Sequence, residues 1–141
     1  MSPKLINGNC HSDGRGFLFY NNDFDSKAIK RIYIIENKSI DFIRGWQGHK
    51  IEQRWLSCVS GKFKIDLIQI DDWDSPSKNL AINSFLIDSE KLDVLHVPPG
   101  YISCIQSMEL NSKLLVMADY LLGEIKDEHR FDSHYFKNKK C

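Results

Sequence analysis

The sequence predicts an all-β protein, either a sandwich or a barrel, and three observations support this fold class. About nine short segments rich in β-branched and aromatic residues follow one another along the chain. Glycine, proline, asparagine and aspartate separate these segments at turn-like intervals. No linker or repeat interrupts the series, so we expect one domain over residues 1–141, long enough to bury a real core.

The individual strands are predicted from local alternation and from the turns between them. An Asp-Gly-Arg-Gly turn at residues 13–16 precedes a short aromatic strand. In the next strand, Arg31, Tyr33 and Ile35 share one face, which is either a polar pocket lining or an exposed edge. Gly61 separates two segments that we expect to form a hairpin. The predicted strands are residues 17–20, 29–36, 41–46, 54–60, 62–71, 82–87, 93–98, 101–107 and 113–122.

Residues 123–136 are the only segment with a helical rhythm. Acidic residues come early in this segment and basic residues come later, which suits a helix dipole. Glycine and aspartate interrupt the rhythm. We therefore expect either a short C-terminal helix or an extended tail.

The composition argues against several classes of partner. Lys plus Arg and Asp plus Glu both number 19, so the net charge is zero, and neither nucleic acid nor an anionic membrane is favoured. No apolar run is long enough to span a bilayer, and Met1 is not followed by the apolar region of a signal peptide. We therefore expect a cytoplasmic protein.

Polar side chains that suit a binding site are concentrated between Arg44 and Gly61, in the sequence RGWQGHKIEQRWLSCVSG. Side chains alternate along a strand, so Gln47 and His49 should project to the same side, with Arg44 entering just before them. Arg44 suits a bidentate phosphate contact or a structural ion pair. His49, with an ordinary pKa of about 6.5, is either a proton carrier or a hydrogen-bonded barrel histidine. Trp46 is either an aromatic platform for a sugar or base, or a core residue.

The same stretch resembles the first motif of the metal-binding cupins, with most of the ligand positions replaced. Gln47-Gly48-His49 stands where that motif has His-x-His, Arg54 stands where it has Glu, and Ser103 stands where it has a later His. One imidazole cannot hold Zn, Fe or Mn tightly, and a cationic Arg54 would oppose a metal ion. The resemblance implies a cupin-type jelly-roll barrel, and the lost ligands predict that it holds no metal. We expect no other cofactor.

Further pieces of the chain resemble the sugar-nucleotide 3,4-ketoisomerases (WxcM/FdtA-like), cupin enzymes that act on dTDP-4-keto-6-deoxyglucose. The pieces occur in the family's order and span nearly the whole chain. They are Asp13–Gly16, Lys30–Tyr33, Arg44–Lys50, Gln53, Gly61, Val97–Gly100 and Leu114–Tyr120. The chain is more distantly similar to the dTDP-4-dehydrorhamnose 3,5-epimerases.

This resemblance implies a homodimer of jelly-roll barrels that binds a nucleotide-linked 4-keto sugar and serves cell-surface polysaccharide synthesis. His49 would move protons, with Tyr33 as the second catalytic candidate, although Tyr33 is also well suited to strand packing. The implied substrate-binding residues are Arg15, Arg31, Arg44, Gln47, Gln53 and Trp46. Arg15 and Arg44 would hold the pyrophosphate or the sugar, and a turn residue such as Arg15 also fits a simply exposed position.

One departure from the family bears on the chemistry. The ketoisomerases read R-G-x-H-A-H, so Gln47 replaces the first histidine, which is the general base of the 3,5-epimerases. An amide cannot accept a proton at a useful pKa, and this disfavours a 3,5-epimerase mechanism. A 3,4-ketoisomerase needs a base that moves a proton between neighbouring carbons, which His49 can supply. The alternatives are a non-catalytic cupin that keeps the sugar-nucleotide pocket, and a metal-dependent cupin such as a dioxygenase.

Overall fold

The computed structural model describes residues 1–137, and within this range it contains strands and turns but no helix. All strand pairs are antiparallel. The strands are β1 (Lys4–Ile6), β2 (Asn9–Asp13), β3 (Gly16–Tyr20), β4 (Arg31–Ile35), β5 (Ile43–His49), β6 (Arg54–Ser60), β7 (Lys62–Gln69), β8 (Ile82–Asp88), β9 (Val94–Val97), β10 (Tyr101–Ser107), β11 (Lys113–Ala118) and β12 (His129–Arg130).

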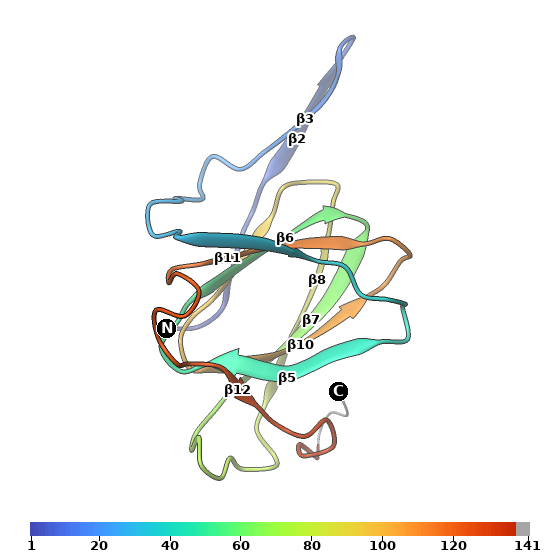
Figure 1. The fold of residues 1–141 in the computed structure, drawn as a ribbon. Coiled ribbons are helices and arrows are strands. Elements are labelled where there is room, and N and C mark those ends of the chain that lie inside the picture. The colour runs from blue at the N-terminus through green and yellow to red at the C-terminus, as the bar shows by residue number, and fades with distance from the viewer. Residues whose placement is uncertain (138–141) are drawn as a thin grey trace.

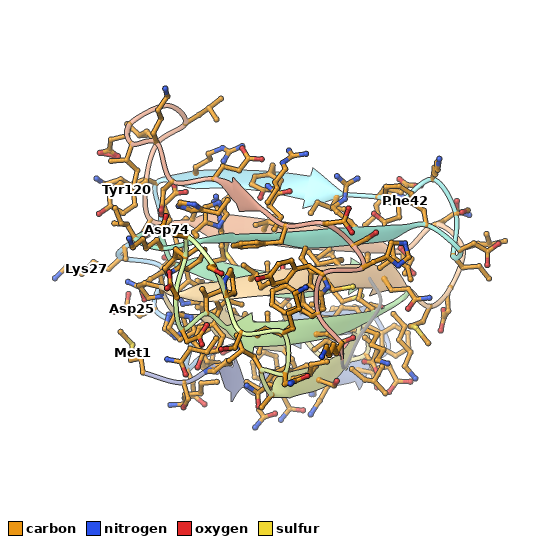
Figure 2. All side chains as sticks on the ribbon, turned by 90° about the horizontal axis from the view of Figure 1, so that it is seen from below. Met1, Asp25, Lys27, Phe42, Asp74 and Tyr120 are labelled. Atoms are coloured by element: carbon orange, nitrogen blue, oxygen red, sulfur yellow. The ribbon has the colours of Figure 1, made fainter. Side chains whose placement is uncertain are left out.

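Two five-stranded sheets face each other and form a cupin-type jelly-roll barrel (Figure 1). The first sheet has the order β1-β9-β6-β11-β4, and the second has the order β12-β5-β10-β7-β8. Strands that are neighbours in space are often distant in sequence, as when β10 lies between β5 and β7. Figure 2 views the barrel from below, with Phe42 at one end of the strands and Tyr120, Asp25 and Lys27 at the other.

The inner faces of both sheets form the main core. Strict alternation in β7 points Phe63, Ile65 and Leu67 inward, and all three are fully buried. They pack against Leu56 of β6 and Leu114 of β11, which belong to the opposite sheet. Burial of these side chains, at roughly 1.5–3 kcal/mol each, holds the two sheets together.

A second apolar cluster covers the outer face of the second sheet. Ile68 and Ile102 point away from the barrel interior, and the C-terminal segment brings Phe136 against them. Phe131 and Tyr135 add further aromatic contacts to Phe136. The last part of the described chain is therefore a packed cover over this sheet.

One hairpin lies outside both sheets. Strands β2 and β3 pair only with each other, and Figure 1 shows them projecting from the barrel as a long arm. The arm exposes three consecutive apolar residues, Phe17, Leu18 and Phe19, with exposed fractions of 74%, 61% and 46%.

The strand predictions from alternation are confirmed. Of the two alternatives for the C-terminal segment, the helix is wrong. All nine predicted strands are present within a few residues of their expected bounds, whereas β1, β2 and β12 were not expected. Residues 123–136 form turns and the short strand β12, which pairs with β5. Gly123 has a positive φ of 80°, and the buried carboxylate of Asp127 bonds to another loop, so tertiary contacts override the weak helical rhythm. Within the described range, no helix is long and apolar enough to cross a membrane.

Candidate active site

A cavity of about 500 Å³ opens between the two sheets and contains most of the predicted site residues. Strand β4 contributes Arg31 and Tyr33, and strand β5 contributes Arg44, Gln47 and His49. This volume is typical of a site for a small organic ligand. A second cavity of about 420 Å³ lies toward residues 121–128. The two cavities share the lining residues Arg31, His49, Arg54, Leu122 and Glu128.

A bulge in β5 brings Arg44 and Gln47 onto the same side. In the pairing with β10, Ser103 lies opposite Gln47 and Cys104 lies opposite Gly45, so Trp46 is an extra residue in β5. Strict alternation would send Arg44 and Gln47 to opposite faces, and the bulge corrects this by one residue. The bulge also sends the Trp46 side chain to the outer cluster, where it packs on Phe136.

His49 is held by a short polar chain at the wall of the cavity. The Nη2 group of Arg54 lies 2.8 Å from His49 Nε2 and donates a second hydrogen bond to Glu52 Oε2 at 3.2 Å. A guanidinium can only donate, so Nε2 must be the accepting, unprotonated nitrogen of the imidazole. The neutral ring therefore carries its proton on Nδ1, a tautomer that the hydrogen bond assigns.

The surroundings of His49 favour the neutral imidazole strongly. Burial and then the positive charge of Arg54 lower the pKa of His49 from its ordinary value to about 4. Asp127 and Glu128 act in the opposite direction, and His129 adds to the lowering. The sequence suggested an ordinary imidazole, but the fold makes His49 a weaker and fully deprotonated base at neutral pH.

The cavity is rich in arginine. The guanidinium of Arg31 stacks over the ring of Tyr33 at 4.5 Å, and that of Arg54 lies 6.0 Å from the same ring. Arg44 is held by Asn37, which accepts from its Nε at 3.2 Å. Among residues 1–137, neither Arg31 nor Arg44 has a carboxylate within ion-pair distance. Both cations are therefore available to an anionic ligand.

Gln47 is oriented by the C-terminal segment. Its Nε2 donates to Glu128 Oε1 at 2.8 Å, and Glu128 is also bound by Arg130 at 2.6 Å. The bond to Glu128 fixes the orientation of the Gln47 amide, with its nitrogen toward Glu128. Glu128 and Arg130 join Gln47 in the cavity lining.

The loop after His49 is anchored by one buried carboxylate. Asp127 accepts from the backbone amides of Lys50, Ile51 and Glu52 at 3.0, 2.7 and 2.7 Å. Burial alone would raise the pKa of Asp127, but these three hydrogen bonds outweigh it and hold the pKa below its ordinary value. Asp127 thus fixes the loop that holds Glu52 in contact with Arg54, the residue that contacts His49.

Three predicted substrate contacts lie outside the cavity within one chain. Arg15 is at the tip of the β2–β3 arm, where its side chain is 90% exposed and pairs with Asp13. Trp46 is 1% exposed in the outer cluster, the core role that the sequence left open. Gln53 points away from the cavity, where it binds Asp119 and His96.

Sequence reasoning missed several residues that build the site. Arg54 was considered only as an obstacle to a metal. Its contact with His49 was missed because the two residues lie on different strands, β5 and β6, with a loop between them. Tyr101, directly opposite His49 in the β5–β10 pairing, lines the cavity and was read only as part of a strand. Asp127 and Glu128 come from the segment predicted as a possible helix. The position of Tyr101 after Pro98-Pro99-Gly100 was the only local signal available.

The donor set around His49 does not suit a metal ion. Within residues 1–137, no group of three or more His, Cys, Asp or Glu side chains could hold one. The cationic Nη2 of Arg54 lies 2.8 Å from His49 Nε2, closer than the carboxylate oxygen Oε2 of Glu52 at 3.4 Å. A cation beside the ring would repel a second cation.

Comparisons with known proteins agree with this architecture. The 3,4-ketoisomerase QdtA from Thermoanaerobacterium thermosaccharolyticum, a mutant in complex with TDP-4-keto-6-deoxyglucose, is similar with a TM-score of 0.72 and 24% identity, covering 99% of this chain and 94% of QdtA. A 3,4-ketoisomerase from Helicobacter canadensis is similar with a TM-score of 0.65 and 25% identity, covering 88% and 89% of the two chains.

A more distant likeness extends to epimerases. The rmlC epimerase of Mycobacterium tuberculosis has a TM-score of 0.73 at 17% identity, covering 94% of this chain and 70% of the epimerase. No curated protein matches the sequence. The family model FdtA, described as WxcM-like, C-terminal, matches residues 1–139. The chain therefore belongs to the FdtA family.

Proposed function

We propose that this protein is an isomerase or epimerase of a nucleotide-activated 4-keto-6-deoxy sugar, with 3,4-ketoisomerisation as the favoured reaction. The observation that carries the proposal is a neutral, largely buried imidazole, His49, at the wall of a cavity lined by arginines. The family and the ketoisomerases with the same fold support the reaction class.

The cavity suits both parts of such a substrate. A diphosphate carries two or more negative charges, and Arg31 and Arg44 are cations without carboxylate partners in the described part of the chain. The sugar would then lie toward His49, Tyr33 and Gln47, which share the cavity with these arginines. A bound diphosphate would also raise the pKa of His49, because nearby negative charge favours the imidazolium.

The reaction is a redox-neutral movement of a carbonyl group. His49 takes the proton from C3, which is acidic because C4 is a ketone, and the electrons pass to the C4 oxygen as an enediolate. The same imidazole returns a proton to C4, while the C3 hydroxyl loses its proton and becomes the new ketone. Tyr33 lies in the same cavity as His49, and its hydroxyl suits the transfer of a proton between the two sugar oxygens. No step needs a metal ion or another cofactor.

Solvent exchange tests the proposal directly. The protein is incubated with dTDP-4-keto-6-deoxyglucose in deuterated water, and proton NMR follows the sugar. We expect a 3-keto product and loss of signal at the carbons that exchange protons. His49→Asn should lower the rate by at least about 10²-fold, the effect of losing a general base. No new keto sugar and no deuterium uptake, despite measurable binding, would refute the proposal.

The structure also favours a second candidate, a module that binds sugar nucleotides without turnover. Two observations support it, namely Gln47 at the position of the family's first histidine and the pKa of His49 lowered to about 4. Titration calorimetry with dTDP and dTDP-sugars separates the two functions. The module predicts binding that His49→Ala leaves unchanged, with no product formed.

We further propose a homodimer in which the β2–β3 arm lies on a second copy. The arm exposes Phe17 and Phe19, and β4 is an edge strand whose outward residues Ile32 and Ile34 are 65% and 56% exposed. A second copy with the same arm and the same edge would cover both apolar surfaces. An arm on the partner's β4 would bring Arg15 toward the partner's cavity, since β4 carries Arg31 and Tyr33 on its inner face.

A further inference from the structure

The guanidinium of Arg54 has buried donors that nothing around them uses. The side chain is 11% exposed, and Nη2 makes its two polar contacts, to His49 and Glu52. The Nε and Nη1 groups are buried and have no acceptor among the described residues. These two groups carry three of the five N–H donors of an arginine. Burying charged donors without acceptors is costly, so this placement points to an acceptor that enters the cavity.

The contact between Arg54 and His49 also conflicts with catalysis as it stands. Nε2 of a neutral imidazole has one lone pair, and Arg54 Nη2 occupies it at 2.8 Å. The other ring nitrogen, Nδ1, carries the proton and cannot accept one. His49 can therefore act as a base only after the guanidinium has moved from Nε2 to another acceptor.

We propose that Arg54 is a catalytic residue that caps the lone pair of His49 in the free protein and moves onto the sugar oxygen that becomes the enediolate anion. The inference rests on the proposed function and adds a residue and a step to it. When the 4-keto oxygen takes hydrogen bonds from Arg54, the lone pair of His49 is uncovered beside C3. The base is thus released only when the group that stabilises the anion is in place.

The position of Arg54 favours a sugar oxygen as its ligand over the diphosphate. The base must lie within about 3–3.5 Å of C3 to take its proton. The 4-keto oxygen is only two bonds from C3, so it also lies near the base. Arg54 already touches the base, so its guanidinium is within reach of that oxygen. Arg31 and Arg44 remain for the diphosphate, and Arg44 is not among the largest influences on the pKa of His49.

The test compares Arg54→Gln, Arg54→Lys and the control Arg44→Gln with the wild type. Nitrogen-15 NMR of histidine-labelled protein reports the tautomer and the pKa of His49, and single-turnover assays report catalysis. The charged neighbours Glu52, Asp127, Glu128 and His129 are unchanged in all variants. Arg54→Gln should raise the pKa of His49, because the cation is lost, and should lower kcat by about 10²–10³-fold with little change in KM. Arg54→Lys, which keeps the charge, should retain more of kcat.

The control separates a general loss of cations from the specific role. Arg44→Gln should raise KM and leave the pKa of His49 unchanged. The inference is overturned if the pKa of His49 is the same in Arg54→Gln and the wild type, or if the loss appears in KM with kcat intact. A wild type that forms no keto product and exchanges no proton overturns the proposed function, and with it the role of Arg54 in stabilising the anion. An active wild type matched by Arg54→Gln overturns this inference alone.

Discussion

His49 shows how the fold changes the chemistry of a single residue. An isolated imidazole has a pKa of about 6.5, whereas burial and the neighbouring Arg54 lower the pKa of His49 to about 4. The folded protein therefore keeps this ring neutral over a pH range in which the unfolded chain protonates it. The same arrangement that presents a neutral base also makes stability depend on pH.

We expect the free energy of unfolding to fall between pH 6.5 and pH 4 because of His49. In this window the unfolded chain binds a proton at His49 that the folded protein does not bind, so acid favours unfolding. Above this window both states are neutral and the contribution is constant. The loss attributable to His49 should reach up to about 3 kcal/mol. Urea unfolding at a series of pH values measures it.

His49→Gln should remove this part of the pH dependence, because an amide does not titrate. His134→Gln is the matched control, since His134 is exposed on a turn and should leave the curve unchanged. If His49→Gln and the wild type lose stability equally between pH 6.5 and pH 4, His49 is not held neutral by the fold.

At this scale, the sequence predicted residues within one strand better than contacts between strands. Arg31 with Tyr33, and Gln47 with His49, follow from alternation along β4 and β5, and the cavity contains all of them. The contact of Arg54 with His49 depends on the shape of the intervening loop, which no local period describes. The inclusion of Arg44 depends on the bulge at Trp46, an extra residue that is visible only in the pairing with β10.

At the scale of elements, the segment after β11 shows where local patterns fail. Residues 123–136 lack a strong period of their own and take their conformation from β5, the loop after it and the outer apolar cluster. The long strands, by contrast, follow from alternating sequences such as that of β7. Short elements held by tertiary contacts, such as β1 and β12, could not be predicted for the same reason.

The anchor in this segment gives a further prediction. Asp127→Asn removes the charge and places an NH₂ group among three backbone N–H donors that need acceptors. We expect a loss of about 2–4 kcal/mol in the free energy of unfolding, since hydrogen bonds to a buried carboxylate are strong. The pKa of His49 should fall further, because Asp127 raises it in the wild type. Denaturant unfolding and histidine NMR measure the two effects.

Asp132→Asn is the control from the same segment. Asp132 is exposed and accepts one backbone hydrogen bond in a turn, from His134 at 2.8 Å. Its substitution should change stability by no more than about 0.5 kcal/mol. Equal effects of the two substitutions would show that Asp127 is not an anchor of the loop.

At the scale of the whole molecule, the unpaired arm and the open edge of β4 are the surfaces that one chain leaves uncovered. The rings of Phe17 and Phe19 stack on each other, with their centroids 6.2 Å apart. In the described chain, the arm that carries them forms no strand pairing with either sheet. Soluble proteins rarely leave such an apolar element exposed. The proposed second copy would cover both surfaces and would give a role to Arg15, which does not line the cavity of its own chain.

The double substitution Phe17→Asp with Phe19→Asp should therefore convert a dimer into a monomer. Light scattering coupled to size exclusion measures the mass, and Leu110→Asp is the control, because Leu110 is 75% exposed and lies outside the arm and β4. The control should remain dimeric.

In the intact dimer, Arg15→Ala should weaken binding of dTDP-sugars without changing the mass, because Arg15 would act in the partner's site. A wild type that is monomeric at micromolar concentration would contradict the proposed dimer. If Arg15→Ala binds dTDP-sugars with the affinity of the wild type, Arg15 does not contact the ligand.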